Sequence, residues 1–134
     1  MSFEDLPNEW PTLSLANSAI AVDVVDLFLK TSDRVHNSAL LLVCDEDGRA
    51  MQPVVINDID WYATADDRTR LFDFLGHLPV PGVIMAVSAR TPVEPEVAQR
   101  WLQTARAELH KYNIELLGFY SADQHAVRAL PAAA

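Results

Sequence analysis

One short apolar segment limits what this chain can fold into. Residues 82–88 have the sequence Gly-Val-Ile-Met-Ala-Val-Ser, with no charged side chain and no polar alternation. The segment is too short for an ordinary helix but has the length of a strand. A strand without alternation is usually covered on both faces. We therefore expect a central strand between two layers of helices, which is a three-layer fold of the α/β (α+β) class.

A second pair of apolar segments predicts a hairpin beside that strand. Residues 38–44 and 51–56 are both apolar, and the connection between them contains Asp45-Glu46-Asp47-Gly48. Asp-Gly between two apolar runs is the strongest short-range signal for a hairpin turn. Pro53 has no N–H to give to a strand ladder, so we expect it to face outward or to lie at a bulge.

The N-terminal part of the chain predicts a largely buried helix after an extended lead-in. Residues 1–14 mix acidic and polar residues with two prolines, which indicates extended chain. Over residues 17–30 apolar side chains cover most of a helical surface, and the remaining face carries Asp23, Asp26 and Lys30. We expect these three side chains on the outer surface.

Two further helices are predicted on either side of the central strand. Thr64 or Asp66 can cap a helix near residues 66–77. Its inner face is expected to carry Leu71, Phe74, Leu75 and Leu78. The clearest helix begins at Pro95, because proline suits the first helical position. It is expected to end before Asn113, a residue that tolerates the left-handed conformation of a C-cap.

The last part of the chain predicts two strands and a tail. Residues 114–120 are expected to form a strand, Asp123-Gln124 a turn, and residues 126–130 a short last strand. Residues 131–134 are expected to form a frayed tail. The predicted order is α-β-β-α-β-α-β-β within a single domain, residues 1–134, with a mixed sheet flanked by helices.

Charge and the length of the apolar segments argue against two classes of partner. The net charge is −9, and residues 1–67 hold 13 of the 19 acidic side chains but 3 of the 10 Lys and Arg. An acidic chain without a basic cluster repels phosphate backbones, so we expect no nucleic-acid partner. We expect no membrane association either, because no apolar segment is long enough to cross a bilayer. Without a leader-like segment, we predict a cytoplasmic protein.

Cysteine and histidine content argues against metal or disulfide chemistry. The single cysteine, Cys44, lies inside an apolar run, where a buried thiol is the ordinary outcome. The four histidines, His36, His77, His110 and His125, are scattered, and no two are four residues apart. We therefore predict no metal ligands, no cofactor and no catalytic residue, and we favour a chain that is not an enzyme.

The end of the central strand is where a ligand site would be expected. Ser88, Arg90 and Thr91 lie in the connection from that strand to the next helix. In open α/β sheets, ligands bind in this position because loop amides and a helix N-terminus are exposed there. Arg90 could hold an anion. These three residues are candidates for ligand binding.

An acidic segment supplies two more candidates. Asp58 and Asp60 lie beside Trp61 and Tyr62. They could form an acidic, aromatic-rimmed patch for a cation, a metal or a protein partner. The structural alternative is that the acidic side chains cap local turns and that the aromatic rings cover the edge of the core.

Several segments between residues 17 and 130 follow the pattern of a known family. They are Leu40-Leu41-Leu42-Val43-Cys44-Asp45, Gly48-Arg49, Val83-Ile84-Met85-Ala86-Val87, Pro92–Pro95, Arg106 and Asn113-Ile114-Glu115-Leu116-Leu117. In these segments and in its order of elements the chain resembles the JAB/MPN domain, and within it the RadC-like branch. The resemblance implies the mixed, helix-flanked sheet that this family shares with cytidine deaminases.

The same resemblance implies the loss of the family's chemistry. Active members bind zinc through a His-x-His-Pro turn and an aspartate, with a glutamate as the general base. The two histidine positions fall on Val87 and Ala89, the aspartate position near Gln99 and the glutamate position near Asn37. Valine, alanine and glutamine cannot replace a zinc shell, which needs three protein ligands and an open position for water. The resemblance therefore implies a metal-free relative.

Two functions follow from these observations. The favoured one is a non-catalytic interaction or regulatory module that acts through a protein partner or as a homodimer. The alternative is a small-molecule-binding domain or metal-independent enzyme with its site at residues 88–91. In that case Asp58 or Asp60 would converge with Ser88, Arg90 and Thr91 in one cleft.

Overall fold

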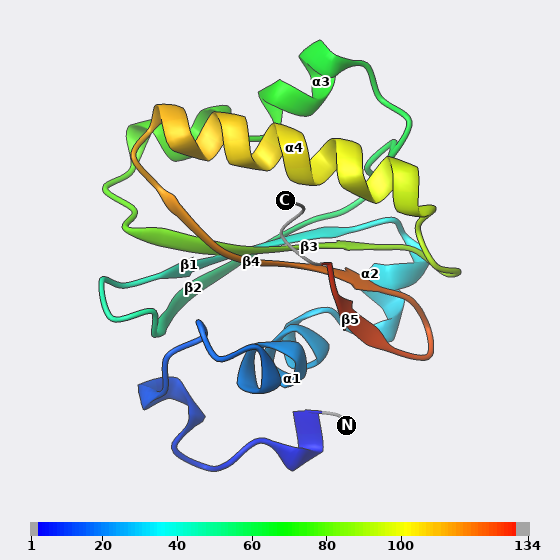
Figure 1. Cartoon of the computed structure of the whole chain (residues 1–134). Coiled ribbons are helices and arrows are strands. Elements are labelled where there is room, and N and C mark those ends of the chain that lie inside the picture. The colour runs from blue at the N-terminus through cyan, green and yellow to red at the C-terminus, as the bar shows by residue number, and fades with distance from the viewer. Residues whose placement is uncertain (1–2, 131–134) are drawn as a thin grey trace.

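The computed structural model describes residues 3–130 and has three layers, with a sheet between helices (Figure 1). The five strands are β1 (Ala39–Cys44), β2 (Ala50–Ile56), β3 (Gly82–Ser88), β4 (Glu115–Ala122) and β5 (Val127–Ala129). They lie in the order β2-β1-β3-β4-β5, and β3 and β4 are parallel while the other neighbours are antiparallel. The mixed sheet and its helices confirm the predicted α+β class.

Helices cover both faces of the sheet. They are α1 (Ser18–Phe28), α2 (Thr31–Val35), α3 (Ala65–Arg70) and α4 (Pro95–Lys111), with 3-10 turns η1 (Phe3–Asp5), η2 (Trp10–Thr12) and η3 (Asp73–His77). In Figure 1, α1 lies on one side of the sheet, and α3 and α4 lie on the other. Within residues 3–130, no helix combines the length and the hydropathy needed to span a bilayer.

The strand β3 is the centre of the core, as its sequence predicts. All of its residues are buried. Val83, Met85 and Val87 pack under α4, while Ile84 and Ala86 pack over α1. Because successive side chains of a strand point to opposite faces, this one apolar run contributes to the core on both sides of the sheet.

The predicted hairpin and the long helix are also confirmed. Gly48 has φ +79° in the turn between β1 and β2, a conformation that glycine adopts without strain. Pro53 lies opposite Leu42 on the outermost strand of the sheet, where its missing N–H is tolerated. Pro95 begins α4, and Asn113 follows its end with φ +58°.

The helix predicted over residues 66–77 is wrong in its second half. Thr64 caps α3 as expected, since its Oγ1 accepts from the amide of Asp67 at 3.3 Å. The helix ends at Arg70, however, and the chain continues through a turn into η3. This break places both Phe72 and Leu75 at 0% exposure and leaves Leu78 48% exposed.

The N-terminal prediction also needs correction. The lead-in contains two 3-10 turns, and α1 ends at Phe28 and is followed by the unpredicted α2. Asp23 is not on the outer surface but is 4% exposed, because η1 packs onto α1. The amide of Phe3 donates to Oδ2 of Asp26 at 2.9 Å, which fixes this contact.

The last strand is shorter than predicted. It covers Val127–Ala129 rather than residues 126–130. It pairs with β4 at Tyr120, Ser121 and Ala122. The frayed tail predicted at residues 131–134 lies outside the described residues.

Candidate functional site

Ser88 is part of the core rather than of a binding surface. Its side chain is fully buried, and its Oγ donates to the carbonyl oxygen of Ser38 at 2.6 Å. Its own carbonyl oxygen accepts from Nε1 of Trp61 at 2.9 Å. Both polar groups of Ser88 therefore hold neighbouring segments together, and its hydroxyl has no open approach for a substrate.

A pair of tryptophans closes the same end of β3. Nε1 of Trp101, on α4, donates to the carbonyl oxygen of Trp61 at 2.9 Å. The two rings pack edge to face, with centroids 5.2 Å apart and an interplanar angle of 87°. Because Trp61 is bonded to Ser88 as well, the loop after β2 is fixed to both β3 and α4.

Arg90 and Thr91 are exposed beyond the strand end. The carbonyl oxygen of Arg90 accepts from the amide of Gln124 at 3.4 Å. Thr91 lines a shallow hollow of about 220 Å³ at the start of α4. At its rim the hydroxyl of Tyr62 donates to Oε1 of Glu94 at 3.1 Å, and this bond to a carboxylate raises the pKa of Tyr62.

Asp58 and Asp60 shape the loop that precedes Trp61. Asp58 has φ +60°, and its amide donates to the carbonyl oxygen of His36 at 2.8 Å. Oδ1 of Asp60 accepts from the amide of Tyr62 at 2.9 Å, a local turn bond. Of the five predicted ligand residues, the hollow is lined by Thr91 and by none of the other four.

The positions at which the JAB/MPN resemblance would place a zinc site are distributed between core and surface. Asn37 and Ala89 line the hollow beside Thr91. Val87 is buried in the core under α4, and Gln99 is half-buried on α4. Within residues 3–130, no group of three or more His, Cys, Asp or Glu side chains is placed to hold a metal ion.

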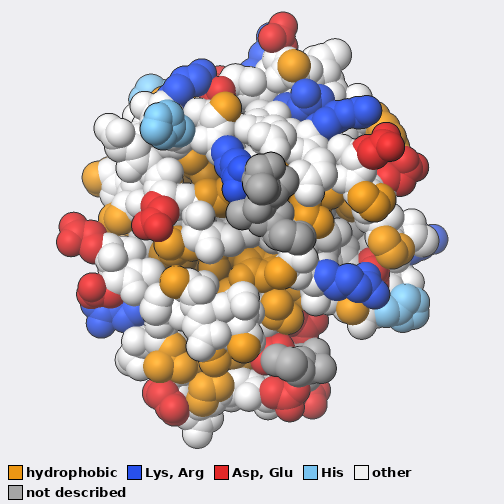
Figure 2. Space-filling model, in the orientation of Figure 1, with side chains coloured by type: hydrophobic (Ala, Val, Ile, Leu, Met, Phe, Trp, Pro, Cys, Tyr) orange, Lys and Arg blue, Asp and Glu red, His pale blue; other side chains and the backbone are white. Residues whose placement is uncertain are grey.

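A different surface has the geometry of a binding site, along the outer edge of β4. The short β5 covers this edge from Tyr120 to Ala122, and the amide of Leu130 donates to the carbonyl oxygen of Phe119 at 2.8 Å. Before Phe119, no other strand of the described chain pairs with this edge. Apolar side chains gather over β4 in the middle of this face (Figure 2).

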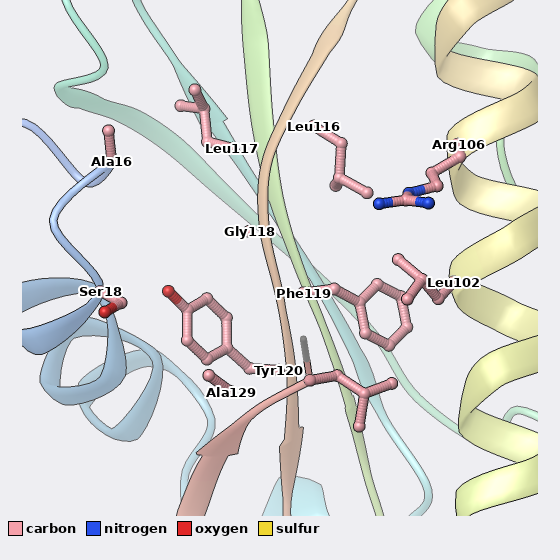
Figure 3. Close-up of a pocket in the computed structure, with 11 residues that line it drawn as sticks. Ala16, Ser18, Leu102, Arg106, Leu116, Leu117, Gly118, Phe119, Tyr120 and Ala129 are labelled. Carbon is pink, nitrogen blue, oxygen red and sulfur yellow. The ribbon is translucent and has the colours of Figure 1, made fainter. Parts of the chain in front are cut away.

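A groove of about 230 Å³ runs along this open edge. Its lining comes from β4, from α4, from the start of α1 and from the end of β5: Ala16, Ser18, Leu102, Arg106, Leu116, Leu117, Gly118, Phe119, Tyr120, Ala129 and Leu130. Leu116 and Phe119 point toward α4, while Leu117 and Tyr120 point toward α1 (Figure 3). We call this surface the β4 groove.

Tyr120 gives the β4 groove an unusual polar atom. Its ring lies so close to Gly118 that a Cβ there would be 2.9 Å from Cε1 of the ring. The side chain is 2% exposed, and burial raises the pKa of its hydroxyl. It lines the groove and points toward Ser18 (Figure 3).

Sequence reasoning missed the β4 groove, because it depends on how far β5 extends along β4. The sequence held one signal for it, because the last predicted strand, residues 126–130, is shorter than the strand before it, residues 114–120.

No protein-family model matches the chain, and neither a curated protein nor a solved structure matches it.

Proposed function

We propose that the chain is a non-catalytic interaction module that binds a protein partner, on a metal-free version of the JAB/MPN fold. One observation carries this proposal. Two of the candidate side chains at the end of β3, Ser88 and Asp60, are engaged in the fold's own hydrogen bonds. Within residues 3–130, an apolar groove lies instead along β4, beside a stretch of its edge that pairs with no other strand.

The order of elements and the mixed sheet support the proposed family relationship. Asn37 and Ala89, at two of the family's zinc-site positions, line one hollow. Neither a carboxamide nor a methyl group can act as a general base, and Val87 is buried in the core. The family's hydrolase activity is therefore not part of the proposal.

A homodimer is one form that this function could take. Residues Met51 and Val55 on β2 are 63% and 37% exposed, and the strand carries no charged side chain. Uncharged edge strands favour association, although Pro53 interrupts the row of amides on this strand. With its net charge of −9, the proposed module works without nucleic acid, and we place it in the cytoplasm.

The alternative, a small-molecule site at residues 88–91, has weaker support. The hollow there measures about 220 Å³, close to the volume of the β4 groove, so the two sites differ in their lining rather than in their size. Ser88 contributes nothing to it, because its side chain is fully buried. Thr91 remains as the one predicted residue in its lining.

The proposal is tested by comparing two baits in affinity capture from the native cell extract. The baits are the wild-type chain and the strand-end variant Arg90→Ala/Thr91→Ala. We expect both to capture the same partner at a fixed stoichiometry, and we expect neither to retain zinc after dialysis against micromolar zinc. Stoichiometric zinc, or turnover of a substrate that the double variant abolishes, would overturn the proposal.

A further inference from the structure

We propose that residues 3–13 form a strap that undocks from α1 while the rest of the fold stays intact, and that the charge on Asp23 controls this opening. The strap contains η1 and η2 and lies on the side of α1 that faces away from the sheet (Figure 1). Leu6 and Trp10 of the strap and Phe28 of α1 pack against the same apolar cluster, so opening uncovers apolar surface on α1. This proposal goes beyond the proposed function, because it does not involve the β4 groove.

Few bonds attach the strap to the rest of the molecule. Its own backbone hydrogen bonds are local, each from an amide to the carbonyl oxygen three residues earlier. Among the hydrogen bonds whose two partners both lie in residues 3–130, one joins the strap to another element: the exposed bond from the amide of Phe3 to Oδ2 of Asp26, at 2.9 Å. The rings of Trp10 and Phe28 add an edge-to-face contact, with centroids 6.0 Å apart. Segments held by so few contacts open locally at low cost.

The strap is clamped at one end and loosely packed at the other. At the clamped end, Leu15 is 0% exposed, and its amide donates to the carbonyl oxygen of Gly48 at 2.8 Å. At the other end, Phe3 is 44% exposed and borders a hollow of about 440 Å³ between the strap, α1 and the turn that joins β4 to β5. The strap can therefore swing away from α1 about residues 14–15 without disturbing the sheet.

Asp23 lies on α1 under η1, and its charge opposes docking. Its side chain is 4% exposed, and its Oδ1 has no hydrogen-bond partner. A buried carboxylate without a full set of partners destabilises the state that buries it. Undocking returns the charged group to water, whereas protonation removes the charge and leaves the strap in place. The closed strap is thus favoured when Asp23 is protonated.

The charged groups around Asp23 set the direction of the pH response. Burial raises the pKa of Asp23 most, followed by Asp5 of η1, while the N-terminal amino group lowers it and Asp26 of α1 raises it. Glu4 adds a further negative charge to η1, and Arg34 balances Asp26 at 2.8 Å. Because the pKa is raised in the docked state, that state binds the proton more tightly than the open one. The strap is therefore closed at low pH and opens as pH rises through the raised pKa.

The three tryptophans separate opening of the strap from unfolding. Trp10 is half-buried on the strap, whereas Trp61 and Trp101 are 6% and 1% exposed in the core on the other side of the sheet. Fluorine NMR of the full chain labelled with fluorotryptophan follows each ring, and Trp10→Phe assigns the signal of the strap. Between pH 4 and pH 8 we expect the Trp10 signal to move toward its position in urea. Its broadening by a soluble gadolinium chelate should rise at least twofold, and the two core signals should not change.

Two matched variants test the assignment to Asp23. Asp23→Asn keeps the size of the side chain and removes its charge, so the Trp10 signal should stay at its closed position throughout this pH range. Asp66→Asn removes the same charge from an exposed position on α3, on the other side of the sheet, and should titrate as wild type does.

Four results would overturn the proposal. They are a Trp10 signal that does not change with pH in the wild type, a shift without increased broadening, Asp23→Asn titrating as wild type does, and movement of all three signals together. A shift without broadening would come from the charge of the neighbouring Glu9, and joint movement would mean that the whole chain unfolds. All except the third are read from the wild-type chain, so they do not depend on the folding of a variant.

Discussion

Trp61 and Trp101 form a buried pair in which the indole of Trp101 donates to the backbone carbonyl of Trp61 at 2.9 Å. The indole of Trp61 in turn donates to the carbonyl oxygen of Ser88. These two bonds join the loop after β2, the end of β3 and α4 into one unit. The place where an α/β sheet usually binds ligands is thus occupied by the protein's own packing.

Trp61→Phe tests this arrangement. Phenylalanine keeps part of the apolar contact with Trp101 but leaves the buried carbonyl of Ser88 without its donor. We expect the free energy of unfolding to fall by about 1–3 kcal/mol, the cost of an unsatisfied buried polar group. Urea denaturation measures it. The control Tyr62→Phe removes an exposed hydrogen bond to Glu94, and we expect it to change stability by less than about 0.5 kcal/mol.

Arg34 ties the turn between β4 and β5 to the helices. Its buried guanidinium donates to the carbonyls of Leu29 and Asp123 and to the carboxylate of Asp26. Arg34→Met should cost about 3–5 kcal/mol, since it leaves the carbonyls of Leu29 and Asp123 without this donor and the carboxylate of Asp26 without its cation. Thermal or chemical unfolding will measure this loss. Arg70→Met, which breaks an exposed pair with Asp67, is the matched control, and an equal loss in both variants would contradict the argument.

Asp23 should make stability depend on pH. Burial, and then the nearby Asp5, raise the pKa of Asp23 above its ordinary value in the folded state. The folded state therefore binds the proton more tightly, so this group contributes stability at low pH and loses it as pH rises through the raised pKa. Asp23→Asn should be more stable than wild type at neutral pH, and the difference should shrink as pH falls toward 4. A constant difference between pH 4 and pH 7 would contradict this assignment.

Cys44 should be chemically silent in the native state. Its thiol is fully buried, and burial and then the nearby Asp45 raise its pKa to about 11. At pH 8 the thiolate fraction is then on the order of one in a thousand. We expect iodoacetamide to label Cys44 only as fast as the chain unfolds, so labelling should accelerate in urea along the unfolding curve. Rapid labelling of the native protein would show that the thiol is accessible.

The elements predicted correctly are those whose residue pattern is compatible with a single kind of structure. A run such as Gly82–Ser88 has no polar face to place, so it could only be a strand covered on both sides. Pro95 and Asn113 marked the ends of α4 by backbone chemistry that does not depend on distant residues. Local rules therefore gave most of the sheet and the longest helix.

The sequence-based predictions were wrong where contacts between residues far apart in the chain determine the structure. Phe72 and Leu75 are both buried only because the chain turns after Arg70, which no periodicity showed. Asp23 is buried by the lead-in, a segment whose contacts could not be predicted. The β4 groove exists because β5 ends at Ala129, and strand ends are set by pairing rather than by composition.

The most direct test of the proposed interaction module is amide hydrogen exchange on the full chain, without and with the protein partner captured from the cell extract. The partner is expected to slow exchange in Glu115–Gly118, the part of β4 whose outer edge no other strand of residues 3–130 covers. No change is expected in residues 89–94, around the hollow at the end of β3. Protection confined to residues 89–94 would contradict the proposal and would favour a ligand site at the strand end.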